Sequence, residues 1–212
     1  MVKVKICGLS TPETMDAALG AGADFVGLVF YAKSPRNVSL EQAAILADRA
    51  RGRAKIVALI VDAEDATLSV INTGVKPDYF QAHGAETPER VSEIVVLTGK
   101  PVIKAIKVAE PADIATAAEY AGKAAFILYD AKAPETLANA LPGGNGIAFD
   151  WQLLAKAKDF MLSGGLNPEN VAQAIAATSA PMVDVSSGVE SAPGRKDLNL
   201  IRKFIEAARA AR

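Results

Sequence analysis

The sequence predicts a single (β/α)8 barrel that spans residues 1–212. Short β-branched apolar runs alternate with alanine-rich helical stretches along the chain, and no linker or change in composition divides it. Repeated strand–helix units build a parallel sheet through right-handed crossovers. Eight such units close into a barrel, and 212 residues lie near the short end of the range for that fold.

Eight segments are predicted to be strands because each is a continuous apolar run, which is typical of parallel strands covered on both faces. They are Val2–Cys7, Phe25–Phe30, Lys55–Val61, Tyr79–Ala82, Val102–Ile106, Ala125–Tyr129, Phe160–Ser163 and Met182–Val185. The alternative is an open doubly wound sheet, which usually carries G-x-G-x-x-G after its first strand. The residues that follow Ile6 here are Cys-Gly-Leu-Ser, which do not match that motif.

Helix starts are predicted where a capping residue precedes a helical stretch. Four pairs have this pattern: Ser10 with Glu13, Ser39 with Gln42, Thr87 with Pro88, and Asn167 with Pro168. At the end of the chain, Leu198, Ile201, Ile205 and Ala208 share one helical face, so we expect a closing amphipathic helix.

The composition excludes several classes of protein. The net charge of -1 disfavours a nucleic-acid binder, which usually carries a basic excess. Cys7 is the only cysteine and His83 the only histidine, so we expect no internal disulfide, no cysteine-based zinc site and no multi-histidine metal centre. No apolar run has the length of a signal peptide or of a membrane helix. We therefore expect a soluble, cytoplasmic protein with no membrane partner, and we expect a monomer because nothing in the sequence suggests an obligatory interface.

The active site of such a barrel lies at the carboxyl ends of its strands. Gly164 and Gly165 follow the seventh predicted strand, and Ser186, Ser187 and Gly188 follow the eighth. Small residues let backbone N–H groups approach an anion, and these two loops often bind phosphate in barrels. The alternative interpretation is that the glycines only allow tight turns.

Cys7 and Asp130 are the candidate catalytic residues. Cys7 ends the first strand beside Lys5 and Gly8, and a lowered pKa there would provide a thiolate base for a proton next to a carbonyl or imine. The alternative is a buried small hydrophobe. Asp130 follows the sixth strand and would act as a general acid if its pKa is raised. The alternative is a helix cap or a loop ion pair.

Three further residues are candidates for substrate binding. Arg36 would hold a carboxylate with two hydrogen bonds, unless it is a solvated surface charge. His83 would line the pocket, unless it makes only a structural hydrogen bond. Asp184 lies in the last strand, next to the predicted phosphate loop. The loop from Ala131 to Ile147 is long for a compact domain, which favours a functional role.

Several segments, distributed over the whole chain, match a known family. They are Lys3–Leu9, Gly27–Tyr31, Ser34–Arg36, Gln81–Gly84, Val102–Ala105, Asp130, Phe149–Trp151, Leu162–Val171 and Val183–Glu190. In this order they resemble phosphoribosylanthranilate isomerase, the barrel enzyme of tryptophan biosynthesis. The resemblance implies an Amadori rearrangement of N-(5-phosphoribosyl)anthranilate to 1-(2-carboxyphenylamino)-1-deoxyribulose 5-phosphate, without metal or organic cofactor.

The resemblance also implies roles for individual residues. Asp130 would be the acid that opens the ribose ring, and Cys7 the base that removes the C2 proton of the resulting Schiff base. Arg36 would hold the anthranilate carboxylate. Backbone N–H groups of Gly165, Ser186, Ser187 and Gly188 would bind the phosphate, and this small phosphorylated substrate is the only partner expected.

Three other functions are weighed against this one. The histidine-pathway barrel isomerase places an aspartate where this chain has Cys7, which argues against it. A Schiff-base aldolase would need a reactive lysine, for which Lys104 is the candidate. A phosphoribosyl-binding barrel without chemistry would bind ligand but not turn it over.

Overall fold

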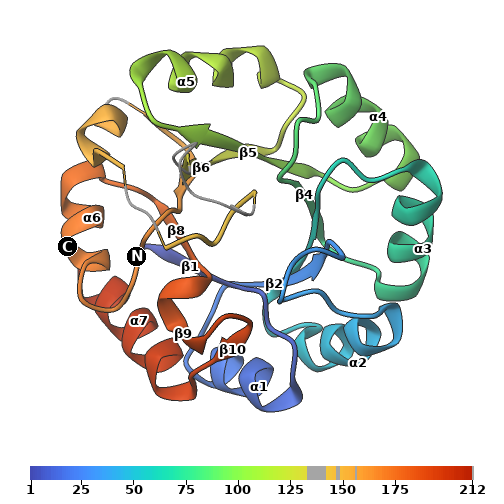
Figure 1. The fold of residues 1–212 in the computed structure, drawn as a ribbon, viewed down its shortest axis with the longest axis horizontal. Helices are drawn as coiled ribbons and strands as arrows, with labels where there is room; N and C mark the ends of the chain where they lie inside the picture. The colour runs from blue at the N-terminus through green and yellow to red at the C-terminus, as the bar shows by residue number, and fades with distance from the viewer. Residues whose placement is uncertain (133–141, 147–148, 156, 212) are drawn as a thin grey trace.

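The computed structural model describes residues 1–132, 142–146, 149–155 and 157–211. Eight parallel strands lie in chain order, and the last pairs with the first to close a barrel. Figure 1 looks along the barrel, with the helices arranged as a ring outside the strands. The strands are β1 (Lys3–Cys7), β2 (Phe25–Phe30), β3 (Lys55–Ile60), β4 (Tyr79–Ala82), β5 (Val102–Val108), β6 (Phe126–Ala131), β7 (Phe160–Leu162) and β8 (Met182–Val185). The predicted fold class is confirmed.

The largest differences from the predicted strands are at the ends of β5 and β6. Each strand ends two residues later than predicted, because their parallel pairing continues through Lys107 with Asp130 and Val108 with Ala131. Asp130 therefore belongs to the strand rather than to the loop after it. A strand holds a side chain more firmly than a loop does, which suits a group that must be accurately aimed.

The helices are α1 (Pro12–Gly20), α2 (Leu40–Ala50), α3 (Asp65–Val75), α4 (Pro88–Thr98), α5 (Pro111–Ala115), α6 (Val171–Thr178) and α7 (Leu198–Ala210), with 3₁₀ turns at Thr116–Tyr120, Trp151–Leu154 and Ser187–Val189. Ser39 and Thr87 cap their helices as predicted. In α7 the buried face is confirmed at Ile201, Ile205 and Ala208, whereas Leu198 is partly exposed at the first position.

Two predicted helix starts were wrong. Thr11, not Ser10, caps α1 and exchanges hydrogen bonds with Thr14, because Pro12 occupies the first helical position. Asn167 does not cap α6. Its Oδ1 accepts from the backbone N–H groups of Glu169 and Asn170 at 2.9 and 3.0 Å, which forms a turn that delays the helix to Val171.

A short hairpin after β8 was not predicted. It pairs β9 (Glu190–Ala192) with β10 (Arg195–Lys196) in antiparallel fashion, and Gly194 adopts a φ of 78° in its turn. A Pro-Gly dipeptide is a turn signal, so Pro193-Gly194 was the sequence feature that marked the hairpin. Figure 1 places it beside the start of α7.

The interior of the barrel changes character along its axis. Aromatic rings of Phe25, Tyr79 and Phe126 pack against one another at its amino-terminal end, with centroids 5.8–6.3 Å apart. At the opposite end the barrel strands present polar groups, among them the buried side chains of Cys7 on β1 and Asp130 on β6. Within the described ranges, no helix is long and apolar enough to cross a membrane.

Candidate active site

One cavity opens at the carboxyl ends of the strands, and it collects nearly all of the predicted site residues. Its lining includes Cys7, Arg36, His83, Asp130, Gly164, Gly165, Asp184, Ser186 and Ser187. Among the described residues, Gly188 is outside this lining. A Cβ at Gly188 would lie 1.8 Å from the Leu166 carbonyl oxygen, so glycine is required there to bring the loops after β7 and β8 together.

Only part of the predicted long loop can be placed. Residues 133–141 and 147 lie outside the described residues. Pro142 through Gly146 line the cavity. Gly143 packs so closely on the acid end of the site that an added Cβ would lie 2.5 Å from His83 Nε2 and 2.7 Å from Asp130 Oδ2. This part of the loop therefore covers the site, and a larger residue at 143 would collide with it.

Cys7 is buried at the end of β1 and packs on Gly27 of β2. A Cβ at Gly27 would lie 2.8 Å from the Cys7 sulfur, so the missing side chain makes room for the thiol. Burial raises the pKa of Cys7, and Lys5 and Lys196 counteract only part of that rise. The prediction that its surroundings lower the pKa was therefore wrong for the free protein, because the loss of hydration outweighs the nearby positive charges.

Lys5 does not act on Cys7 as a free cation because it is paired. Its Nζ lies 2.8 Å from Asp184 Oδ1, and both side chains are almost fully buried. The other oxygen of Asp184 accepts a hydrogen bond from Ser163 Oγ at 3.2 Å. Burial alone would lower the pKa of Lys5, but Asp184 and Cys7 together raise it. Lys5 is thus charged and largely neutralised by Asp184.

Asp130 is held by a chain of polar groups from β4. His83 Nε2 lies 3.2 Å from Asp130 Oδ2, and Gln81 Nε2 lies 2.8 Å from His83 Nδ1. With Gln81 donating to Nδ1, a neutral His83 carries its proton on Nε2 and donates it to Asp130. The other oxygen of Asp130 accepts from the backbone N–H of Ala131 at 3.0 Å. The carboxyl group is therefore oriented by hydrogen bonds to both of its oxygens.

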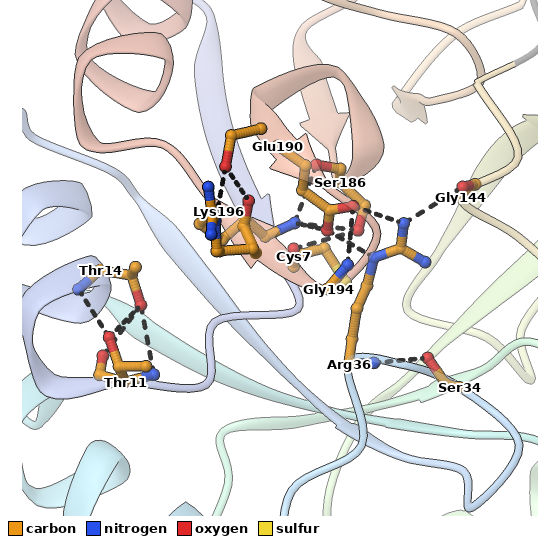
Figure 2. Close-up of polar contacts among 12 residues, drawn as sticks. Cys7, Thr11, Thr14, Ser34, Arg36, Gly144, Ser186, Glu190, Gly194 and Lys196 are labelled. Carbon is orange, nitrogen blue, oxygen red and sulfur yellow. Dashed lines mark hydrogen bonds and ion pairs between the residues drawn. The ribbon is translucent and has the colours of Figure 1, made fainter.

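Arg36 points into the cavity from the loop after β2, and Glu190 of β9 holds it there. Its Nε and Nη2 donate to the two carboxylate oxygens of Glu190 at 2.7 and 2.9 Å, and Nη2 also donates to the Gly144 carbonyl at 3.3 Å. Lys196 donates to the same carboxylate at 2.8 Å. Figure 2 shows this group of side chains meeting beside Cys7 and Ser186.

Glu190 and Lys196 are the site residues that sequence reasoning missed. Neither ends a barrel strand, and only the turn signal between them hinted at the hairpin that brings both under the cavity. Burial on its own raises the pKa of Glu190, but its hydrogen bond to Arg36 and the charge of Lys196 keep that pKa below the ordinary value. The carboxyl group of Glu190 is therefore ionised, and it contacts two cations, Arg36 and Lys196.

The loops after β7 and β8 have the geometry that exposes backbone N–H groups. Gly164 and Gly165 adopt φ values of 89° and 63°, which favour glycine. Ser186 Oγ donates to the Cys7 carbonyl at 3.2 Å and so links the second loop to β1. Successive N–H groups in such turns bind anions, and both loops open into the cavity that holds Cys7 and Asp130.

Lys104, the lysine required for an aldolase, points elsewhere. Its Nζ donates to Glu86 Oε2 and to the Gly84 carbonyl, both at 2.8 Å. Among the described residues it is not part of the cavity lining. This position disfavours the Schiff-base aldolase.

Comparison with known proteins agrees with the geometry. A family model described as N-(5'phosphoribosyl)anthranilate (PRA) isomerase matches residues 4–207. The N-(5'-phosphoribosyl)anthranilate isomerase of Parvibaculum lavamentivorans is 52% identical over 99% of both chains, and that of Rhodopseudomonas palustris is 56% identical over 98% of this chain and 95% of its own.

Solved structures give the same result. The phosphoribosyl anthranilate isomerase from Thermotoga maritima aligns with a TM-score of 0.88 and 38% identity over 99% of both chains. Another structure of a phosphoribosyl anthranilate isomerase, in complex with reduced 1-(o-carboxyphenylamino)-1-deoxyribulose 5-phosphate, aligns with a TM-score of 0.85 and 36% identity over 99% of both chains. This chain belongs to the N-(5'-phosphoribosyl)anthranilate isomerase family.

Proposed function

We propose that this protein converts N-(5'-phosphoribosyl)anthranilate to 1-(2-carboxyphenylamino)-1-deoxyribulose 5-phosphate in tryptophan biosynthesis. The observation that carries the proposal is that one buried cavity combines a thiol, a carboxyl group, an arginine and two anion-binding turns. The substrate presents matching groups: a carbon acid, a ring oxygen, a carboxylate and a phosphate. Family membership supports the same activity.

The first step is ring opening, with Asp130 as acid. Its carboxyl group donates a proton to the ribose ring oxygen while the bond from that oxygen to C1 breaks. The electron pair on nitrogen then forms the C1=N bond of a cationic Schiff base. His83, 3.2 Å from Asp130 Oδ2, donates a hydrogen bond to the carboxylate that this step leaves.

The second step is proton removal by Cys7. The thiolate takes the proton from C2, and the electrons of that bond form a C1=C2 bond as the C1=N bond returns its pair to nitrogen. Protonation of C1 and loss of the hydroxyl proton then give the C2 ketone. Because burial raises the pKa of Cys7 in the free protein, the thiol needs help to ionise. The cationic Schiff base supplies it, since a nearby positive charge favours the thiolate.

Binding of the substrate's two anionic groups is divided between a side chain and backbone N–H groups. Arg36 holds the anthranilate carboxylate, and the backbone N–H groups of Gly164, Gly165, Ser186 and Ser187 hold the phosphate. Asp184, whose carboxylate is buried in the cavity wall, accepts a hydrogen bond from a ribose hydroxyl. Gly188 contributes by allowing the close approach of the loop to Leu166.

We further propose that the enzyme acts as a monomer in the cytoplasm. Its acid, its base and both anion-binding regions line one cavity of one chain, so catalysis requires no residue from a second copy. Sedimentation at assay concentration tests this proposal. A dimer whose dissociation abolishes activity would contradict it.

The activity is tested with the purified protein and freshly made phosphoribosylanthranilate. We expect the protein to consume the substrate, and the loss of substrate fluorescence measures this consumption. We expect no turnover of the related histidine-pathway ribonucleotide. A phosphoribosyl-binding barrel without chemistry would bind the reduced product but leave the substrate unchanged, and that result would refute the proposal.

A further inference from the structure

Lys196 is a buried cation that, in the described part of the chain, is not among the residues that line the cavity. Its side chain is fully buried, and its Nζ donates to Glu190 Oε1 at 2.8 Å, to the Ser186 carbonyl at 2.8 Å and to Ser186 Oγ at 3.2 Å. Burial lowers the pKa of Lys196 to about 8, against the attraction of Glu190, so the ammonium is mostly charged at neutral pH. A buried charge costs free energy unless it is paired, and the partner of Lys196 is already paired with Arg36. The presence of a second buried cation at this carboxylate therefore calls for an explanation.

The reason lies in how charge is shared around Arg36. Two cations, Arg36 and Lys196, divide the single carboxylate of Glu190, and all three side chains are at most 6% exposed. The three groups together carry one net positive charge. If Lys196 were neutral, Arg36 and Glu190 would form a closed, uncharged pair held by two hydrogen bonds of 2.7 and 2.9 Å.

The guanidinium of Arg36 also lies where this net positive charge can act on a ligand in the cavity. Its hydrogen bonds to described residues come from Nε and Nη2, while Nη1 lies beside Gly144 at the cavity, where a Cβ on that glycine would be 2.7 Å away. Figure 2 shows Arg36 between Glu190 on one side and Gly144 on the other. A carboxylate that is already paired with an arginine weakens the attraction of that arginine for a second carboxylate, and another cation on the first carboxylate offsets part of this loss.

We propose that Lys196 is a positioning residue for substrate recognition: by sharing Glu190, it leaves Arg36 with the positive charge that selects a substrate carboxylate. The inference rests on the proposed function, in which Arg36 binds the anthranilate carboxylate. It goes beyond that function by assigning the carboxylate selectivity to a lysine that makes no contact with the substrate.

The test measures equilibrium binding rather than turnover, because Lys196 also lowers the pKa of Cys7 and would alter catalysis by that route. Two ligands are compared: reduced 1-(2-carboxyphenylamino)-1-deoxyribulose 5-phosphate and the same compound without the carboxyl group. The ratio of their dissociation constants isolates recognition of the carboxylate from recognition of the phosphate. If the unaltered protein binds neither ligand, the proposed function itself fails, and the result is distinguishable from a failure of the inference.

In Lys196→Met we expect this selectivity ratio to fall about tenfold, because Arg36 is then neutralised by Glu190. Adding Glu190→Gln to Lys196→Met restores the net charge of one and should return the ratio to within about threefold of the original. Lys196→Gln, which keeps a hydrogen-bond donor near Ser186 without the charge, should behave like Lys196→Met and serves if the methionine variant does not fold. Lys104→Met is the matched control, since Lys104 is also a buried lysine paired with a glutamate at 2.8 Å but lies outside the cavity lining.

Two outcomes overturn the inference. Equal weakening of both ligands would leave the ratio unchanged and assign Lys196 to the phosphate loop through Ser186. A ratio that falls in the single variant and stays low in the double variant would show that the charge shared through Glu190 is not the cause.

Discussion

At the amino-terminal end of the barrel interior, Phe25 meets the rings of Tyr79 and Phe126, and the filling is apolar. At the carboxyl end, strands of the same barrel present Cys7, Asp130 and Asp184, all buried. The first end gains free energy from burial, whereas the second holds charges that cost free energy unless each is paired. The comparison teaches that stability and chemistry are assigned to opposite ends of one barrel.

The largest expected effect is loss of turnover at the carboxyl end. Cys7→Ala and Asp130→Asn should each lower kcat by about 10²–10⁴-fold or more, because each removes a proton-transfer group. The melting temperature of both variants should stay close to that of the unaltered protein. The measurement is steady-state consumption of phosphoribosylanthranilate, with circular dichroism as the folding control. Near-normal kcat in either variant would remove that residue from the mechanism.

Substitution at the apolar end should lower the stability of the protein and leave kcat unchanged. Phe25→Ala removes a ring that packs on two others and should lower the free energy of unfolding by about 3–5 kcal/mol. The folded fraction should keep its kcat, since Phe25 and Cys7 belong to separate clusters of buried residues. The change in the free energy of unfolding is measured by urea denaturation, with tryptophan fluorescence as the signal. A large loss of kcat in fully folded protein would break the division between the two ends.

Lys5→Met probes the boundary between the two ends. The substitution leaves the buried Asp184 without the cation that lies 2.8 Å away in the unaltered protein. The free energy of unfolding should therefore fall by about 3 kcal/mol, even though Lys5 lies near the catalytic thiol and not at the apolar end. Double substitution, Lys5→Met with Asp184→Leu, should recover part of that loss because no unpaired charge remains. Unfolding in urea gives both values. If the single variant is as stable as the unaltered protein, the ion pair does not matter to the fold.

The smallest expected effect concerns the ionisation of Cys7. Burial raises the pKa of Cys7 above the ordinary value of 9.0. In the pH range between these two pKa values, the thiol is protonated in the folded protein and ionised in the unfolded chain. This contribution to stability is therefore complete below about pH 9 and is lost as the pH rises through the folded-state pKa. The rate of alkylation of Cys7 by iodoacetamide should still be rising at pH 9. A rate that levels off below pH 8 would mean that Lys5 and Lys196 win over burial.

The fold was predictable because the strands are continuous apolar runs separated by cap signals, and these are local features. Seven of the eight predicted substrate-binding residues and both predicted catalytic residues line the cavity, because the barrel rule locates strand ends from the same local pattern. The site's electrostatics were not predictable in this way. The rise in the pKa of Cys7 depends on how much water the closed barrel removes from the thiol. The pairing of Arg36 with Glu190 joins residues 154 positions apart.

The sequence by itself therefore determined the barrel, its order of strands and the places where Cys7 and Asp130 emerge, since periodicity and turn signals are written locally. The tertiary structure alone decided which charges meet. It placed Asp184 against Lys5, and it folded the hairpin after β8 so that Lys196 and Arg36 share one carboxylate. Ionisation follows distance and burial, and both exist only once strands far apart in the chain have closed on one another.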